Sequence, residues 1–454
     1  MSNIKDMTEG KPIRLMIKFS IPLLISNVLQ VLFVVADSAI IGRMLGVSAF
    51  ASIGATVTLH WLVFSAVLGL NQGFSTLIAQ RFGAKDTDGL HRAFSTSIFL
   101  AAAFSVAIGA LGVTFCRLLM ELMHTPHDLI DGSVTYLSWL WAGKPLMFGY
   151  NLLAMTLFAL GDSKTPLRAM IVATVINIAF DLILVIPLEI AGVAMASLIA
   201  QATAMAFCIR ALRKTGIFKG FKLKFDSPSA WPLLRLALPL GFRNAVIEVG
   251  GLVVQRYVNA YGTEFVAGVA AAKRMYSLLM IAGGALEVSI STFVAQNFGA
   301  KQFDRVKQGL KDGLLLAAVS VVAIMAFTLP LGRQILSLLI DGDAAQVSAV
   351  LDVGTRQLML MTLGLPFCYL LFIYRSALQG LGNTFIPMLS GFVELALRIF
   401  SVIALTRFIG DRAVLISDPI AWPFAMTLLM ISYFVVFKRV RKQGEEIREK
   451  GIET

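Results

Sequence analysis

Apolar residues occur along this chain in long, nearly unbroken runs that are separated by short polar segments. About 20 consecutive apolar residues form a helix that crosses roughly 30 Å of hydrocarbon, whereas the strands of a membrane barrel alternate apolar and polar positions. No such alternation is present, so the pattern predicts membrane-spanning helices. Twelve runs fit this description, at residues 13–41, 48–80, 92–116, 131–159, 165–187, 191–212, 231–260, 265–297, 304–330, 346–380, 385–408 and 417–438.

The composition agrees with this pattern. Of 454 residues, 57% are hydrophobic and 15% are charged, and the mean hydropathy is +0.80. A water-soluble domain of this size would not tolerate so apolar a surface, so we expect an all-α membrane protein. The first run is too long for the core of a signal peptide and no A-x-A-like cleavage site follows it, so we expect it to remain in the protein.

The net charge of +12 would suit a nucleic-acid partner, but the positions of the charges decide against one. If the N-terminus is cytoplasmic, most Lys and Arg residues fall in cytoplasmic segments, for example Lys214, Lys219, Lys222 and Lys224 in the central loop. This is the positive-inside bias of membrane proteins, which explains the charge without nucleic acid. It predicts that both termini are cytoplasmic.

An internal repeat predicts the domain organisation. "STLIAQRFGAK" at residues 75–85 recurs as "STFVAQNFGAK" at 291–301, with eight of eleven positions identical, and Pro22 and Asn27 pair with Pro239 and Asn244 in the same order. A duplication of six helices places both copies across the membrane in the same sense, related by a pseudo-two-fold axis along the membrane normal. We expect a six-helix lobe at 1–213, a basic linker at 214–230, a second six-helix lobe at 231–440 and a cytoplasmic tail at 441–454.

The two Ala-Gln-x-Phe-Gly-Ala-Lys loops, the "PLLISN" start of the first helix and "ALGDSKTP" before the fifth helix resemble the multidrug and toxic compound extrusion (MATE) family. The resemblance covers nearly the whole chain. It implies an antiporter with two six-helix lobes in the plasma membrane of a prokaryote. Such a protein would export amphipathic, mostly cationic drugs or toxins against an inward proton or sodium gradient, with membrane lipid as its surroundings and no other subunit.

Two carboxylates and an amide lie within the apolar runs of the first lobe. Asn177 and Asp181 share a helix face because they are four residues apart, and Asp37 falls at a similar depth on the first helix. A carboxylate at the membrane centre costs roughly 2.5 to 3.5 kcal/mol, so these residues are candidates for function. The resemblance to the DinF-like branch implies that the three form an ion-coupling site. The alternative is that each aspartate only bonds a neighbouring helix.

The chemistry of this candidate site leaves the coupling ion open. Two carboxylates held close together in a poorly hydrated place repel each other, which favours proton uptake by the pair. A sodium ion could instead use the same oxygens. We expect no cofactor and no other metal.

Pro22 lies fifteen residues before Asp37 on the first helix. Proline removes one backbone hydrogen bond and clashes with the preceding turn, so the helix can bend at this position. The resemblance implies a hinge; a static kink is the equal alternative.

Charged residues in the second lobe and one lysine in the first are candidates for the substrate cleft. Glu248 matches an acidic position of the family, and Glu394 and Arg398 either contact substrate or form an intrahelical ion pair. Glu287, Lys273 and Arg274 on the eighth helix have no assignable partner. The tenth helix lacks the acid of the NorM-like branch. Lys144 either snorkels towards water, tunes the aspartates or contacts an anionic group of a substrate.

Three classes of function fit a polytopic membrane protein. Ion-coupled export is favoured, and flipping of a lipid-linked cell-envelope precursor is the alternative, which would need a strongly cationic cleft. An enzyme is not expected, since the four histidines are unpaired within the spans and no nucleotide-binding motif occurs.

Gly69 and Gly73 form a small-x-x-x-small pair, which indicates close helix packing.

Overall fold

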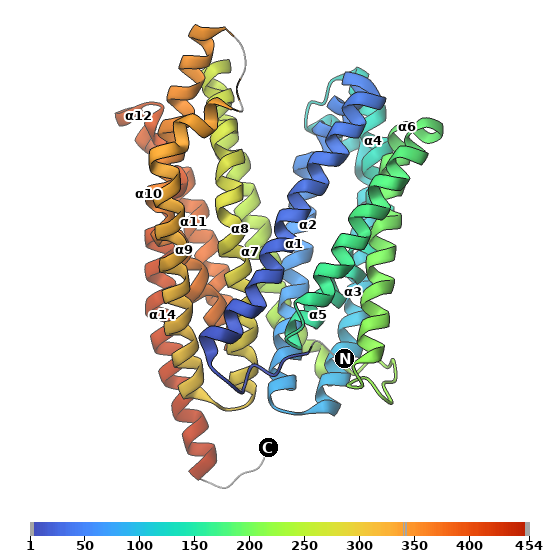
Figure 1. The fold of residues 1–454 in the computed structure, drawn as a ribbon, viewed down its shortest axis with the longest axis vertical. Helices are drawn as coiled ribbons and strands as arrows, with labels where there is room; N and C mark the ends of the chain where they lie inside the picture. Colours follow the sequence, from blue (N-terminus) through green and yellow to red (C-terminus); the bar gives the residue numbers. More distant parts are fainter. Residues whose placement is uncertain (1–3, 339, 341–342, 450–454) are drawn as a thin grey trace. The chain divides into compact units, whose positions relative to one another are not determined.

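The computed structural model describes residues 4–338, 340 and 343–449, and among these residues helices are joined by turns and loops, with no strand (Figure 1). The elements are α1 Pro12–Met44, α2 Gly46–Gly83, α3 Thr87–Leu122, α4 His127–Ala142, α5 Lys144–Ala159, α6 Lys164–Lys214, α7 Ser227–Val258, η1 Asn259–Tyr261, α8 Thr263–Gly299, α9 Phe303–Ser337, α10 Ala344–Gly380, α11 Phe385–Phe400, η2 Ser401–Leu405, α12 Thr406–Ile409, α13 Arg412–Leu415 and α14 Ser417–Glu449.

These elements form the twelve predicted spans. Ten helical segments among the described residues are long and apolar enough to cross a membrane. One of them, α6, holds two spans, because Glu189 adopts a φ of +48° just after Pro187 and breaks the helix there. The remaining span, the fourth along the chain, consists of α4 and α5, of 16 residues each. These two helices meet at Gly143 because Pro145 cannot continue the hydrogen-bond ladder of α4.

The predicted ends of three helices are too early. The helices α3, α9 and α14 continue past the predicted ends at residues 116, 330 and 438, to Leu122, Ser337 and Glu449. Hydropathy marks only the part of a helix within hydrocarbon, and polar turns beyond it are not visible in that signal. Residues 441–449, expected in a tail, therefore continue α14, while 450–454 lie outside the described residues.

The chain packs as two units. The first contains Met1–Met7 and Lys18–Gly241, and the second contains Thr8–Ile17 and Phe242–Thr454. In the first unit α2 packs against α3, α4 and α5, and α6 packs against α4 and α5; in the second, α10 packs against α8, α9 and α14. The lobe boundary predicted at 214–230 stays a prediction, whereas the packing of the chain changes units between Gly241 and Phe242, inside α7.

Gly69 and Gly73 lie where α2 meets the first half of α7. A Cβ atom on Gly69 would lie 2.4 Å from the carbonyl oxygen of Leu240, and one on Gly73 would lie 2.3 Å from Cα of Ala237. Any side chain at these positions would force the backbones apart. The interpretation of this glycine pair as a packing motif is confirmed.

Candidate functional site

The structure brings Asp37 and Asp181 together in the first unit. Their side chains, from α1 and the first span of α6, lie close enough to interact by charge and by hydrogen bonding. Asp181 and Asn177 are fully buried, and Asp37 is half-buried. Because a carboxylate has no hydrogen to donate, a hydrogen bond between two carboxyl groups contains one proton. The arrangement can therefore hold a proton between the two helices.

Tyr136 on α4 is a third side chain at this pair that sequence reasoning missed. It interacts electrostatically with both Asp37 and Asp181. Its ring packs against the buried cluster of Ile41 and Val185, which lie one turn beyond each aspartate on their helices. No sequence signal identifies Tyr136, since a tyrosine in an apolar helix has many possible neighbours and the rotation of α4 decides which ones it meets.

Lys144 is the first residue of α5, at the break between α4 and α5. Its side chain is fully buried, and Nζ lies 3.7 Å from Sδ of Met147. A snorkelling lysine keeps its ammonium in water, so that interpretation is wrong. Its charge acts on His60 of α2, so two basic side chains interact electrostatically within the first unit.

Glu394 and Arg398 form part of a buried ionic network in the second unit. The predicted pair within α11 is present but loose, at 4.0 Å between Arg398 Nη2 and Glu394 Oε2. The tighter contacts are between helices: Arg375 Nη2 on α10 lies 2.5 Å from Glu394 Oε1, and Arg398 Nε lies 2.6 Å from Asp418 Oδ1 on α14. The network therefore joins α10, α11 and α14, and Arg375 and Asp418 are members that the sequence did not assign.

A backbone contact extends this network to α7. Arg398 Nη1 donates a hydrogen bond of 3.1 Å to the carbonyl oxygen of Ile247. The half-buried neighbour Glu248 is close enough to Arg398 to interact with its charge. Removing one partner of a buried ion pair commonly costs about 3–5 kcal/mol, so these residues hold the second unit together as well as being candidates for binding.

Two of the α8 residues that had no assignable partner have partners in the structure. Glu287 Oε1 lies 3.6 Å from Arg243 Nη1 on α7, and Lys273 Nζ donates a hydrogen bond of 3.1 Å to Oε1 of Gln255, also on α7. Each of the buried arginines Arg243, Arg375 and Arg398 thus lies beside an acid.

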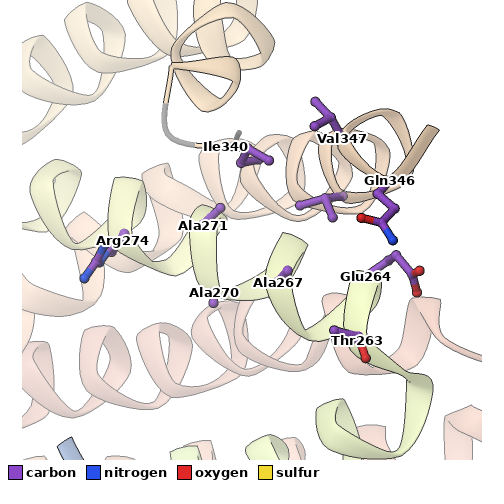
Figure 2. Close-up of a pocket in the computed structure, with 10 residues that line it drawn as sticks. Thr263, Glu264, Ala267, Ala270, Ala271, Arg274, Ile340, Gln346 and Val347 are labelled. Carbon is purple, nitrogen blue, oxygen red and sulfur yellow. The ribbon is translucent and has the colours of Figure 1, made fainter. Parts of the chain in front are cut away.

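A separate cavity is lined by none of the predicted residues. It measures about 720 Å³ and lies in the second unit, where α8 and α10 begin (Figure 2). Its charged lining residues are Glu264 and Arg274, and the remaining ones are Thr263, Ala267, Ala270, Ala271, Ile340, Gln346, Val347 and Val350. No group of three or more His, Cys, Asp or Glu side chains within the described part of the chain is arranged to hold a metal ion.

Pro22 lies inside α1, which continues through it from Pro12 to Met44. The residues of α1 up to Ile17 belong to the second unit, and those from Lys18 onward belong to the first. Because proline has no backbone N–H, the carbonyl of Lys18, four residues earlier, lacks its usual helical donor. The weakest point of the ladder of α1 therefore coincides with the place where the helix passes from one unit to the other.

Known proteins match the chain along most of its length. The family model described as MatE matches residues 22–183 and 239–403, and the two segments begin at the paired prolines of the internal repeat. "Probable multidrug resistance protein YoeA" of Bacillus subtilis (strain 168) is 30% identical over 453 residues, which cover 95% of each chain. "Probable multidrug resistance protein YpnP" of the same organism is 32% identical over 312 residues, which cover 66% of this chain and 68% of its own.

A solved structure shows the same fold. The one described as "Crystal structure of MATE in the bent conformation" superposes with a TM-score of 0.88 and 19% identity, over 97% of this chain and 98% of its own. The predicted class, a twelve-helix membrane protein built from two six-helix repeats, is confirmed.

Proposed function

Because the chain belongs to the MatE family, we propose that it exports amphipathic, mostly cationic small molecules in exchange for protons or sodium ions. The observation that carries this proposal is that Asp37 and Asp181, from two membrane-spanning helices, lie close enough together to interact. The names of the relatives as multidrug resistance proteins support the substrate class. The chain acts as a transporter and not as an enzyme.

Exchange follows if ion and substrate compete for the same negative charge. A cationic substrate binds the pair most tightly when both carboxyl groups are ionised. Binding of a proton or sodium ion at Asp37 and Asp181 removes that attraction. Asn177 lies one turn from Asp181 and orients the pair by hydrogen bonding. The ion gradient then drives export because the ion and the substrate favour different states of the transporter.

Flipping of a lipid-linked precursor would need a surplus of cationic side chains to bind a polyanion. In the second unit Arg243, Arg375 and Arg398 each lie within 4.0 Å of an acidic side chain, so their charges are already compensated. Small-molecule export is therefore the better supported function.

Efflux from proteoliposomes tests the proposed function. The protein is reconstituted with the cationic dye ethidium, and a proton gradient or a sodium gradient is imposed alone. We expect dye movement against its own gradient with at least one of the two, and movement with one alone identifies the coupling ion. Equal dye movement with and without either gradient would refute ion-coupled exchange.

We further propose that both termini are cytoplasmic, on the strength of the charge bias. In intact cells an impermeant thiol reagent should label Asp128→Cys and Asp343→Cys and should not label Lys222→Cys. These three side chains are exposed, and the native Cys116, Cys208 and Cys368 are buried, so the background is low. Permeabilised cells provide the control, since Lys222→Cys should react there. Labelling of Lys222→Cys in intact cells would reverse the orientation.

A further inference from the structure

The segment between α6 and α7, residues 215–226, is fastened to α3 in the first unit. Ser95 Oγ donates a hydrogen bond of 2.7 Å to the carbonyl oxygen of Lys224 and lies 2.7 Å from its backbone nitrogen, which donates back to it. One turn earlier, His91 Nε2 lies 2.7 Å from the carbonyl oxygen of Ile217. This segment lies within the basic linker predicted at 214–230, and from here on we call residues 215–226 the linker. Its hydrogen bonds hold it against the end of α3.

Aromatic side chains of the linker cover an apolar cavity. The rings of Phe218 and Phe221 lie 4.9 and 5.5 Å from that of Phe94 on α3, measured between centroids. Beneath them is a cavity of about 640 Å³ whose walls come from α3, α5 and α6. Its lining is almost wholly apolar and includes Ile98, Ala102, Phe148, Gly149, Met205 and Ile209.

The length of the cavity corresponds to one leaflet of a bilayer. On α3 its lining runs from Phe94 to Ser105, and the eleven helical rises between them, at 1.5 Å each, span about 16 Å. The hydrocarbon core is roughly 30 Å thick, so one leaflet provides about half of that. An acyl chain entering from the linker side would fill this length.

The linker end of the cavity is strongly basic. Arg213 lines the cavity there. The exposed side chains of Lys214, Lys219, Lys222 and Lys224 are each next in sequence to a lining residue. Within the described residues, none of these five side chains forms an ion pair with an acid. A phosphate group at this end would meet several uncompensated cations, and basic pockets between membrane helices are known to bind anionic headgroups.

We propose that this cavity binds one anionic glycerophospholipid. One of its two acyl chains lies beneath Phe218 and Phe221, and its phosphate lies between Arg213 and the linker lysines. The lipid fills the apolar space under the linker and holds the linker against α3. The site lies apart from the aspartate pair, so this inference stands independently of the transport mechanism.

Native mass spectrometry of the purified full chain tests the lipid site, with dioleoyl phosphatidylglycerol and dioleoyl phosphatidylcholine as probes in separate titrations. We expect one phosphatidylglycerol to be retained with at least tenfold preference. The triple variant Lys219→Gln, Lys222→Gln, Lys224→Gln should weaken its binding about tenfold or more, because one cation near an anionic headgroup is worth roughly fivefold. A matched triple variant on the second unit, Lys301→Gln, Lys307→Gln, Lys311→Gln, removes the same charge and should leave this binding unchanged.

A second pair of variants tests the apolar part of the site. Ala102→Trp places a large side chain in the cavity and should reduce retention of phosphatidylglycerol, whereas Ala103→Trp, exposed on the same helix outside the cavity lining, should not. The lysine variants alter only exposed side chains, so they test the headgroup even if Ala102→Trp fails to fold. Equal retention of both lipids, or equal losses in the two lysine triple variants, would overturn the proposal.

Discussion

Asp37→Asn and Asp181→Asn should each reduce ion-driven ethidium export to the level of protein-free vesicles. In the proposed mechanism, each substitution removes a negative charge that attracts the cationic substrate and one of the two carboxyl groups that bind the coupling ion. The remaining aspartate is also relieved of its charged neighbour, so it no longer responds to the ion as one member of a pair. Export should fail even with a full gradient.

The double variant distinguishes one site from two. If Asp37 and Asp181 act as a unit, Asp37→Asn combined with Asp181→Asn should cost little more than either change alone, because coupled residues are not additive. Two independent sites would instead give losses that multiply. Dye efflux is measured at matched amounts of folded protein in the membrane.

A matched control is available on α4. Asp131 is exposed and pairs with Arg117 at the surface, so Asp131→Asn makes the same chemical change in the same unit. Exposed ion pairs contribute about 0–1 kcal/mol, and export by this variant should stay near that of the unchanged protein. Undiminished gradient-driven export by either Asp37→Asn or Asp181→Asn would refute the coupling mechanism.

The existence and order of the helices could be predicted because hydropathy and the internal repeat are local signals. The break in the helix before Lys144 could not be predicted, although Pro145 was visible in the sequence. The apolar run continues across the break, and hydropathy does not report backbone geometry. Lys144 itself illustrates the consequence: at a helix start its side chain turns inward and becomes fully buried.

Partners between helices were the least predictable part of the site. Glu394 and Arg398 are four residues apart, so their pairing could be expected from helix geometry. Their stronger contacts, with Arg375 and Asp418, depend on how α10 and α14 are rotated about their axes. The contact of Asp37 with Asp181 could be anticipated because similar depth in the membrane restricts two helices to a narrow zone, whereas nothing in the sequence directs Tyr136 towards them.

Pro22→Ala should lower ethidium export about tenfold or more while leaving dye binding nearly unchanged. Exchange of the kind proposed here requires the two units to move relative to each other during each cycle. Residues of α1 before Lys18 are fastened to the second unit, where Ser289 Oγ donates to the carbonyl oxygen of Met16. Residues after it pack in the first unit, where Phe19 meets Phe158. Any such motion must therefore be absorbed within α1 and α7, the two helices that pass from one unit to the other.

The size of the effect follows from the backbone. Proline in a helix interior costs about 3 kcal/mol through its missing donor and its clash, and alanine removes that penalty only when the helix is straight. The straight form would thus gain up to about 3 kcal/mol over the bent form, which lowers the population of the bent form by roughly a hundredfold. If the cycle passes through the bent form, its turnover falls with that population.

Pro330→Ala on α9 is the control, because it also restores a donor inside an apolar helix but lies within one unit. It should transport like the unchanged protein. Equilibrium binding of ethidium to the detergent-solubilised variants separates a hinge from a binding defect, since a hinge variant keeps its affinity while its efflux rate drops. Efflux by Pro22→Ala equal to that of the unchanged protein would mean that Pro22 forms only a static kink.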